Sequence, residues 1–327
     1  MRAVLYEEQG RLVRGVGGLY EIRLDGGDTP LSGRTAFSRA KGNFRHAGLT
    51  PLVGDRVRVR YDDIAASRYT GQEPPANDDG GGVVIAEILP RLNALIRPPM
   101  ANIGVLFIAF AAAQPAPALE TVDKLIAIAE YNHIEPIPVI SKKDIAPEYA
   151  AELCLLYRNA GFTAFTVSSV EDDGVGELRA WIDCELGERI AAFAGASGVG
   201  KSTLLNALYP KLSLATGEIS RKIERGRHTT RRVELYPIGE GFVADTPGFS
   251  MLDFVRFDFF KKEDLPLVMR EFDPYLGTCR YTKCTHTKEE GCAVLAALRE
   301  GKIAPSRHAS FLSMYEDLRH KHDWSKK

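Results

Sequence analysis

Residues 195–202 read Gly195-Ala196-Ser197-Gly198-Val199-Gly200-Lys201-Ser202, which fits the pattern GxxxxGK(S/T) at every fixed position. An apolar run at residues 190–194 precedes this stretch, and a helix-like stretch at residues 203–209 follows it. A strand, a glycine turn and a helix start in this order bind a nucleoside triphosphate, because backbone N–H groups converge on the phosphate oxygens. We expect Lys201 to add positive charge at the β- and γ-phosphates and Ser202 to coordinate Mg²⁺, and we include the next residue, Thr203, in the nucleotide-binding set.

Two further elements follow the glycine turn along the chain. Residues 243–249 read VADTPGF and predict a strand ending in DxxG, where Asp245 supports Mg²⁺ and the Gly248 N–H meets a γ-phosphate. Between the two lies Arg227-His228-Thr229-Thr230, in which Thr229 or Thr230 can complete the Mg²⁺ shell. This order of elements is typical of a switch GTPase.

The element that reads the base lies upstream of the glycine turn instead of downstream. An apolar run at residues 137–140 leads into Ser141-Lys142-Lys143-Asp144, which is close to NKxD, and a second run leads into Ser168-Ser169. The Asp144 carboxylate can accept hydrogen bonds from the ring N–H and the exocyclic amino group of guanine, a paired contact that adenine does not offer. Taken alone, residues 141–144 also suit an ordinary solvated loop. Beside the other elements, they favour GTP over ATP.

The element order is therefore base-reading loop, serine loop, phosphate loop, threonine switch and DxxG, a circular permutation of the usual GTPase domain. Permutation is physically allowed because domain termini often lie close together at the surface. Helical spacing of apolar residues predicts a helix at residues 119–131 that covers the sheet. The strands of a doubly wound α/β sheet are predicted at residues 105–110, 137–140, 162–167, 190–194 and 243–245.

A cysteine and histidine cluster follows in the C-terminal part, at Cys279, Cys284, His286 and Cys292. This Cys₃His set is typical of a closed tetrahedral zinc site. Disulfides are the alternative, but an odd number of clustered thiols with a histidine among them favours a metal. Four protein ligands leave no position for water, so we expect the zinc to be structural. The other cysteines, Cys154 and Cys184, lie in apolar helix-like stretches that suit small buried hydrophobes.

The motifs together resemble the RsgA family, also called YjeQ, of GTPases that depend on the small ribosomal subunit. The resemblance rests on GxSGVGKSTLLN at residues 195–206, GRHTT at 226–230, DTPGF at 245–249 and the following C-x4-C-x-H-x5-C. It implies a late maturation factor that binds the rRNA of the small subunit. It also implies that the subunit stimulates hydrolysis of GTP to GDP and that hydrolysis is coupled to release of the factor.

Two features depart from the family pattern. Ser141 replaces the usual Asn of NKxD, which loses an amide that ties the base-reading loop to the phosphate loop. Residues 71–82 resemble an insertion.

The N-terminal part is predicted to be β-structure. Apolar and polar residues alternate at residues 19–24 and 55–60, and a third apolar run lies at residues 83–88. Short strands suit a small barrel, and the family resemblance implies an OB-like barrel that binds RNA. The expected domains are an OB-like RNA-binding barrel at residues 1–97, a circularly permuted GTPase domain at 98–250 and a mainly helical zinc-binding domain at 251–327.

Composition limits the partners. The 327-residue chain has a net charge of −1 at pH 7, so contacts with RNA must come from local patches such as the basic segment 221–232. A solvated loop is the alternative for that segment. No apolar run approaches the ~18 residues that cross a bilayer, and no apolar segment of signal type begins the chain. We therefore expect no membrane contact, a cytoplasmic location and a monomer away from the ribosome.

The water that attacks GTP lacks its usual protein partner. Small GTPases place a glutamine just after DxxG, whereas Phe249 stands here and cannot hold a water. His228 is the nearest candidate for positioning the water or accepting its proton, and the GRHTT pattern of the family favours this role. Contact of His228 with RNA or solvent is the alternative.

Two other classes of protein are alternatives to a GTPase. A P-loop kinase or ATPase would need an adenine pocket, and Asp144 with Ser168-Ser169 argues against one. An RNA-binding module with a decayed nucleotide site would not need Lys201, Ser202 and Asp245. The sequence therefore predicts an active GTPase that uses Mg²⁺ and one structural zinc.

Overall fold

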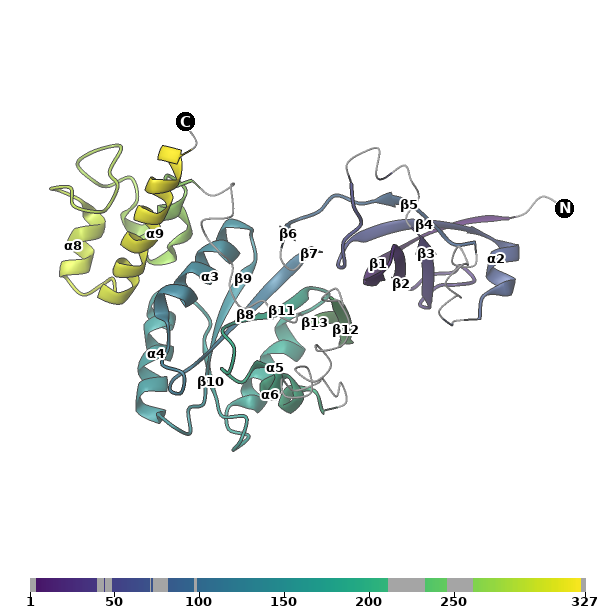
Figure 1. Cartoon of the computed structure of the whole chain (residues 1–327), viewed down its shortest axis with the longest axis horizontal. Coiled ribbons are helices and arrows are strands. Elements are labelled where there is room, and N and C mark those ends of the chain that lie inside the picture. The colour runs from purple at the N-terminus through teal and green to yellow at the C-terminus, as the bar shows by residue number, and fades with distance from the viewer. Residues whose placement is uncertain are drawn as a thin grey trace. The chain divides into compact units, whose positions relative to one another are not determined.

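The computed structural model describes residues 4–39, 44, 49–70, 72, 82–96, 99–210, 233–245 and 261–324. The chain divides into two compact units, whose elements Figure 1 labels. Unit 1 comprises Met1–Gly104, Leu186–Ala192 and Ile223–Pro247, and unit 2 comprises Val105–Glu185, Phe193–Lys222 and Gly248–Lys327. The division passes through β8 (Ile103–Ala111) and β11 (Ile190–Ala194), so each unit combines segments that are distant in sequence.

Unit 1 begins with five antiparallel strands that share one core. The strands are β1 (Leu5–Val16), β2 (Leu19–Leu24), β3 (Thr35–Arg39), β4 (Arg56–Asp62) and β5 (Val84–Ile88). They pair in the order β3-β2-β1-β4-β5, and the Ile85 N–H donates to Ser38 Oγ at 3.2 Å, which links β5 back to β3. Alternate residues such as Val57, Val59 and Tyr61 are buried, as the alternating sequence predicts. The three strands predicted in this region are confirmed.

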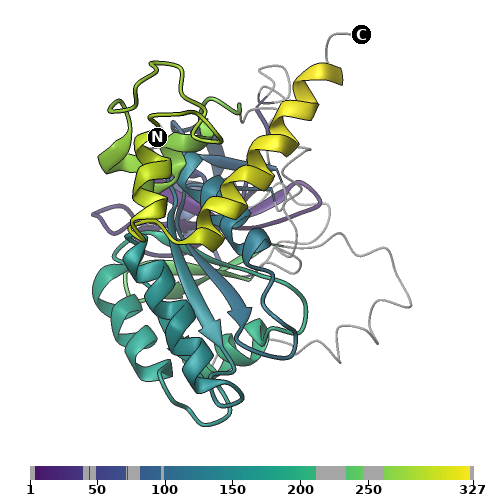
Figure 2. The same ribbon diagram turned by 90° about the vertical axis from the view of Figure 1, so that its left-hand side faces the viewer.

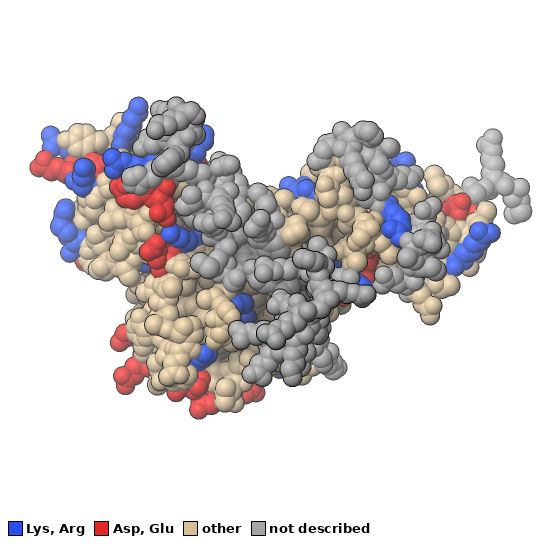
Figure 3. Space-filling view, viewed as in Figure 1, with Lys and Arg blue, Asp and Glu red and all other residues tan. Residues whose placement is uncertain are grey.

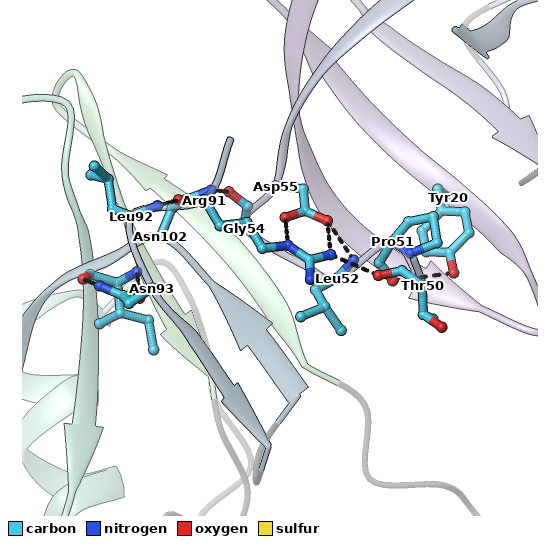
Figure 4. Close-up of polar contacts among 11 residues, drawn as sticks. Tyr20, Thr50, Pro51, Leu52, Gly54, Asp55, Arg91, Leu92, Asn93 and Asn102 are labelled. Carbon is cyan, nitrogen blue, oxygen red and sulfur yellow. Dashed lines mark hydrogen bonds and ion pairs between the residues drawn. The ribbon is translucent and has the colours of Figure 1, made fainter. Parts of the chain in front are cut away.

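Side-chain hydrogen bonds fix the chain where it leaves these strands (Figure 4). The fully buried Asp55 accepts two hydrogen bonds from Arg91, at 2.7 Å from Nε and 2.8 Å from Nη2. Asn102 Nδ2 donates to the carbonyl oxygen of Gly54 at 3.1 Å. The residues between Arg91 and Asn102 form a two-stranded ribbon of β6 (Ala94–Ile96) and β7 (Pro99–Ala101). The ribbon is thereby tied to the loop that precedes β4.

A β-hairpin of β12 (Glu234–Ile238) and β13 (Gly241–Asp245) completes unit 1. β12 also pairs with β1, through Glu234 and Arg14. β13 pairs in parallel with residues 190–192 of β11. The strand predicted at residues 243–245 is therefore confirmed as the end of β13.

Unit 2 contains a parallel sheet with helices on both faces. Its elements are β8, β9 (Glu135–Ser141), β10 (Phe165–Val167), α3 (Leu119–Tyr131), α4 (Pro147–Asn159), α5 (Val175–Glu185) and α6 (Lys201–Leu208). β8 and β10 both pair in parallel with β9. On β8, Phe107 packs edge-on against Trp181 of α5, whereas Phe110 packs edge-on against Tyr157 of α4. Since residues three apart on a strand face opposite sides, α4 and α5 cover opposite faces of the sheet.

The doubly wound α/β arrangement is confirmed with one correction. The helix predicted at residues 119–131 has those bounds in the structure, and β11 spans the predicted residues 190–194. β10, in contrast, begins at Phe165 and not at residue 162. The reason is that the Phe162 N–H bonds back to the Tyr157 carbonyl at the end of α4, and Arg158 donates to the Ala164 carbonyl. Residues 162–164 therefore form a connection that is bonded back to the last turn of α4, and they do not join the strand ladder.

The C-terminal part of unit 2 consists of helices and a loop segment packed on α3. The helices are the 3₁₀ helices η3 (Leu265–Val268) and η4 (Arg270–Tyr275), and α8 (Ala293–Arg299) and α9 (Pro305–Trp324). Figure 2 shows α9, in yellow, along its length. The core of this part includes Phe272 and Phe311, and two residues of α3, Ala127 and Ile128, belong to the same core.

A buried ion network also joins this part to α3 and α4. Arg307 Nη1 lies 2.5 Å from Asp123 Oδ1, and Arg307 Nε lies 2.7 Å from Glu271 Oε1. All three side chains are at most 4% exposed, and Tyr157 OH donates to the same Asp123 oxygen at 3.1 Å. Burial alone would lower the pKa of Arg307, but the carboxylates of Asp123 and Glu271 raise it, so the guanidinium stays charged.

Charges of both signs are present on the face drawn in Figure 3, with acidic side chains along its lower edge.

Among the residues that the structure describes, no helix has both the length and the apolar composition needed to cross a membrane.

Candidate nucleotide and metal sites

The phosphate loop lies between a buried strand and a helix. All five residues of β11 are buried, and the chain then passes through Gly195, Gly198 and Gly200 into α6. These glycines have φ angles of 142°, 83° and 92°. A Cβ atom on Gly195 would lie 2.0 Å from the carbonyl oxygen of Ala109, so only glycine fits there. The predicted strand, glycine turn and helix are thus present, and the first N–H groups of such a helix are suited to anions.

The side chain of Lys201 lies over the loop that precedes it. Its Nζ donates to the carbonyl oxygens of Gly195 and Ala196, at 2.7 Å in both cases. Burial lowers its pKa. Two carbonyl groups therefore hold the ammonium group at the loop, where a phosphate oxygen can replace them as its partner.

Ser141, at the end of β9, is linked to the phosphate loop by its hydroxyl group. Ser141 Oγ lies 2.6 Å from the carbonyl oxygen of Val199 and 3.2 Å from that of Phe110, and the residue is 4% exposed. A hydroxyl has one hydrogen, so it donates to one carbonyl at a time, and Val199 is the nearer. The two loops are therefore joined through the Ser141 hydroxyl, although the amide of the family pattern is missing.

The residues after Ser141 form a tight turn. Lys142 has a φ of 56°, and its Nζ donates to the carbonyl oxygen of Gln114. Lys143 Nζ pairs with Asp173 Oδ2 at 2.6 Å. Asp144 is exposed, and its carboxylate forms no hydrogen bond or ion pair with any described residue. Its oxygens are therefore available to a ligand.

The serine loop lies beside this turn. Ser168 is fully buried, exchanges two main-chain hydrogen bonds with Asp173, and accepts a hydrogen bond from the Glu171 N–H at its Oγ. Ser169 is half-buried. The ion pair between Lys143 and Asp173 joins this loop to the base-reading turn. Ser141 and the serine loop follow neighbouring parallel strands, so the carboxyl ends of β9 and β10 place the two loops together.

The cysteine and histidine cluster has the dimensions of a metal site. The ligand atoms of Cys279, Cys284, His286 and Cys292 all lie within 4.8 Å of one another. His286 Nδ1 is 3.6 Å from Cys279 Sγ and 3.5 Å from Cys292 Sγ, and the two sulfurs are 3.9 Å apart. A tetrahedral zinc with Zn–S bonds of about 2.3 Å places its sulfurs ~3.8 Å apart. The cluster therefore fits a Cys₃His zinc site.

Groups around the cluster hold its loop in place. His308 Nε2 donates to the His286 carbonyl at 3.0 Å, and the Ala293 N–H donates to Cys279 Sγ at 3.3 Å. The Glu289 carboxylate accepts from the Thr285 N–H at 2.8 Å. Burial alone would raise the pKa of Glu289, but hydrogen bonds led by those from Thr285 lower it to about 2. The ionised Glu289 carboxylate therefore holds the loop through hydrogen bonds from Thr285.

Comparison with known proteins identifies the family. A model of the RsgA GTPase matches residues 88–255, and a model of the RsgA N-terminal domain matches residues 9–67. The chain belongs to the RsgA family. The small ribosomal subunit biogenesis GTPase RsgA of Caldanaerobacter subterraneus subsp. tengcongensis is 38% identical over 315 residues, which cover 96% of each chain. The same-named protein of Halalkalibacterium halodurans is 36% identical over 96% of this chain and 98% of its own.

Solved structures of RsgA-like proteins share the whole fold. YjeQ from Thermotoga maritima aligns with a TM-score of 0.75 at 27% identity, over 96% of this chain and 99% of its own. YloQ, described as a circularly permuted GTPase, aligns with a TM-score of 0.74 at 28% identity, over 97% and 96%. The permuted order of elements inferred from the motifs is therefore the order of this RsgA chain, in which β9 and its loop precede β11 and the phosphate loop.

Part of the RsgA site lies outside the described residues. These are His228, Thr229 and Thr230 of the first switch, the rest of the basic segment 221–232, Gly248 of DxxG, and most of the 71–82 insertion. Asp245 ends β13, but its side chain is likewise not described. The roles given to these residues stay predictions.

Sequence reasoning was wrong about one cysteine and missed several partners in this RsgA chain. Cys154 is buried as expected, but Cys184 is exposed, because it lies on the outer side of α5. Asp173, the partner of Lys143, was not recognised, and neither were Arg307 and Asp123. A run of acidic residues after Ser168-Ser169 was the available signal for Asp173. For the other pair, separated by 184 positions, there was none.

Proposed function

We propose that this chain hydrolyses GTP as a biogenesis factor of the small ribosomal subunit. The observation that carries the proposal is the meeting of three loops at one edge of the sheet. The phosphate loop contacts Ser141 at 2.6 Å, and Lys143 joins the base-reading turn to the serine loop at 2.6 Å. Relatives at 35–38% identity over at least 95% of this chain carry the name of such a factor.

Guanine would be read by the turn and the serine loop. The carboxylate oxygens of Asp144 have no partner among the described residues and would accept from the ring N–H and the exocyclic amino group of guanine. Lys142 and Lys143 are held by a carbonyl and a carboxylate, so their aliphatic stems can flank the base. Ser168 and Ser169 would support the opposite side.

The triphosphate would lie in the phosphate loop, residues 195–203. Main-chain N–H groups of the loop would bind phosphate oxygens, and Lys201 would leave its two carbonyl partners for the β- and γ-phosphates. Mg²⁺ would bridge the β- and γ-phosphates and neutralise the charge that develops on them. We assign Ser202, Asp245 and one of Thr229 and Thr230 to hold it, and the Gly248 N–H to the γ-phosphate.

Hydrolysis would depend on His228 and on the partner. We assign His228 to position the attacking water, because Phe249 occupies the place of the usual glutamine. Ordering of the first switch by the small subunit would bring His228 to the γ-phosphate, so turnover without the subunit would be slow.

The N-terminal and C-terminal parts of the chain would bind the small subunit. We propose that residues 1–97 form an RNA-binding barrel, 98–250 the GTPase domain and 251–327 a domain held by one structural zinc. Action on small subunits would place the chain in the cytoplasm as a monomer that binds rRNA, without membrane contact.

Co-sedimentation with purified small subunits tests this function. We expect the chain to sediment with small subunits in the presence of a non-hydrolysable GTP analogue and to be released with GDP. Lys201→Ala, which removes the phosphate ligand, should abolish the difference between the two nucleotides. Equal sedimentation of the parent chain with the GTP analogue, an ATP analogue and no nucleotide would contradict the proposal.

A further inference from the structure

Three arginines lie side by side on the outer face of the N-terminal strands. Arg23 of β2 and Arg56 of β4 are the direct cross-strand neighbours of Arg11 of β1, one on each side. Like charges directly opposite each other destabilise a sheet. Such a row therefore needs counter-ions within the protein or an anionic ligand.

Only Arg56 has a carboxylate partner among the described residues. Asp25 binds it through both oxygens, at 2.9 Å and 2.7 Å. Arg11 lies over the ring of Phe242, with 5.3 Å between the guanidinium carbon and the ring centroid, and its Nη2 lies 3.4 Å from the Glu188 carbonyl. Its Nε is buried and has no hydrogen-bond partner in the part of the chain that the structure describes. Arg23 is exposed and forms no hydrogen bond or ion pair with any residue that the structure describes.

The neighbouring arginines on the same face, in contrast, have carboxylate partners. Arg58 pairs with Glu7 at 3.2 Å and with Glu87 at 2.9 Å, and Arg60 pairs with the other Glu7 oxygen at 2.7 Å. This end of the face is neutralised by its own carboxylates. On this face, Arg11 and Arg23 are therefore the two of these five arginines without a carboxylate partner among the described residues.

The arginine row opens into a hollow of about 460 Å³ within unit 1. Its wall includes Gly26 and Gly33, whose lack of side chains lets a ligand approach the backbone, and Phe242. Three carboxylates also line it: Asp25 is paired with Arg56, whereas Glu188 and Glu240 are exposed and pair with neither Arg11 nor Arg23 among the described residues. Burial, and after it the charge of Arg56, lower the pKa of Arg11, while the nearby carboxylates of Asp25 and Glu188 act in the opposite direction.

We propose that Arg11 and Arg23 bind a backbone phosphate of the small-subunit rRNA in this hollow. The choice of rRNA as the partner rests on the proposed function. The position of the site rests on the guanidinium groups of Arg11 and Arg23, which have no carboxylate partner among the described residues. Planar guanidinium forks match the geometry of phosphate oxygens, and a phosphate between the two arginines would remove their mutual repulsion.

A salt series of RNA binding tests the site. Arg11→Gln, Arg23→Gln and the control Arg58→Gln each remove one positive charge from the same face. Binding to protein-free small-subunit rRNA and to intact small subunits is measured from low to moderate salt. We expect Arg11→Gln and Arg23→Gln each to weaken binding and to reduce the slope of log affinity against log salt by about 0.7–0.9, the value for one phosphate contact. Arg58→Gln should leave the slope unchanged.

Measurements of unfolding temperature and of GTP binding distinguish phosphate binding by these arginines from a purely structural role. Arg23→Gln should unfold at the same temperature as the parent chain or at a higher one, because it relieves like-charge repulsion. Its GTP binding should be unchanged. An unaltered salt slope in both Arg11→Gln and Arg23→Gln, or an equal loss in Arg58→Gln, would overturn the site while leaving the GTPase function standing. Failure of the parent chain to bind either rRNA or subunits would instead overturn the proposed function.

Discussion

The two ends of unit 2 hold their important side chains in different ways. At the nucleotide end, Ser141 and Lys201 bond to main-chain carbonyls, and Asp144 has no protein partner among the described residues. At the zinc end, Arg307 and Asp123 are buried together at 2.5 Å, and the same part of unit 2 contains the Cys₃His cluster that fits a zinc site. A group that exchanges a protein partner for a nucleotide is best held by hydrogen bonds to carbonyl groups, which the nucleotide can replace. A part that serves as a fixed body is better held by bonds whose loss is costly.

The largest effect should come from removing the metal at the zinc end. Cys284→Ser takes away one of the four proposed ligands, and we expect folding of the loop segment to depend on metal binding. Metal analysis should find about one zinc per parent chain and much less in the variant, with a lowered unfolding temperature. GTP binding should survive, since no cysteine lies in the nucleotide loops.

The matched control for the zinc site is Cys184→Ser, because Cys184 is exposed on α5. It should keep its full zinc content and its stability. A Cys284→Ser protein that also kept both would show that the cluster does not hold the metal.

The next largest effect should come from the buried ion network. Arg307→Met leaves Asp123 and Glu271 buried without their partner, which should reduce the free energy of unfolding by about 3–5 kcal/mol. Arg319→Met is the control: Arg319 is 60% exposed and pairs with Glu316, so its loss should cost about 0–1 kcal/mol. Urea unfolding measures both. Equal stability of the two variants would remove the contrast between the ends of unit 2.

A smaller and more selective change is expected at the base-reading turn. Asp144→Asn should weaken GTP binding by roughly 1.5–3 kcal/mol, the range for hydrogen bonds to charged groups. The variant should favour xanthine nucleotides, whose added carbonyl accepts from the new amide. Titration with GTP and XTP measures the exchange of specificity, with Asp172→Asn on the neighbouring loop as the control. Unchanged GTP affinity would take Asp144 out of the site.

The smallest effect is expected at Ser141. Ser141→Ala leaves the Val199 and Phe110 carbonyls without the hydroxyl donor and should weaken GTP binding by ~1 kcal/mol. Ser141→Asn supplies two N–H hydrogens for the same two carbonyls, so its binding should equal or exceed that of the parent. A large loss in Ser141→Asn, with none in Ser141→Ala, would mean that the hydroxyl does not tie the two loops.

Much of the nucleotide end and of the metal cluster was predictable, because each of their motifs is contiguous in sequence. The glycine turn, the strand before it and α6 follow from one motif, and Cys279 to Cys292 give the metal cluster by spacing alone. The permuted order could be inferred because each motif carries its own strand. The helix at Leu119–Tyr131 was predicted to the residue by its apolar spacing.

The rest depends on register and tertiary packing, which the sequence states only indirectly. That Val199 accepts from Ser141 requires β9 and the phosphate loop to be neighbours. Whether an arginine on β4 is neutralised depends on which residues of β1 and β5 lie opposite. The strand Arg56-Val57-Arg58 therefore gave no sign that Arg11 and Arg23 lack a carboxylate partner among the described residues. Arg307 and Asp123 meet only because α9 packs on α3.

Phosphate release from GTP, measured with and without purified small ribosomal subunits, tests the central claim most directly. We predict slow release by the chain alone and a severalfold or greater increase when subunits are added at equal concentration. His228→Ala should lose the increase while still sedimenting with subunits in the presence of a GTP analogue. A parent chain whose GTP hydrolysis does not respond to subunits, or does not exceed that of Lys201→Ala, would contradict the account.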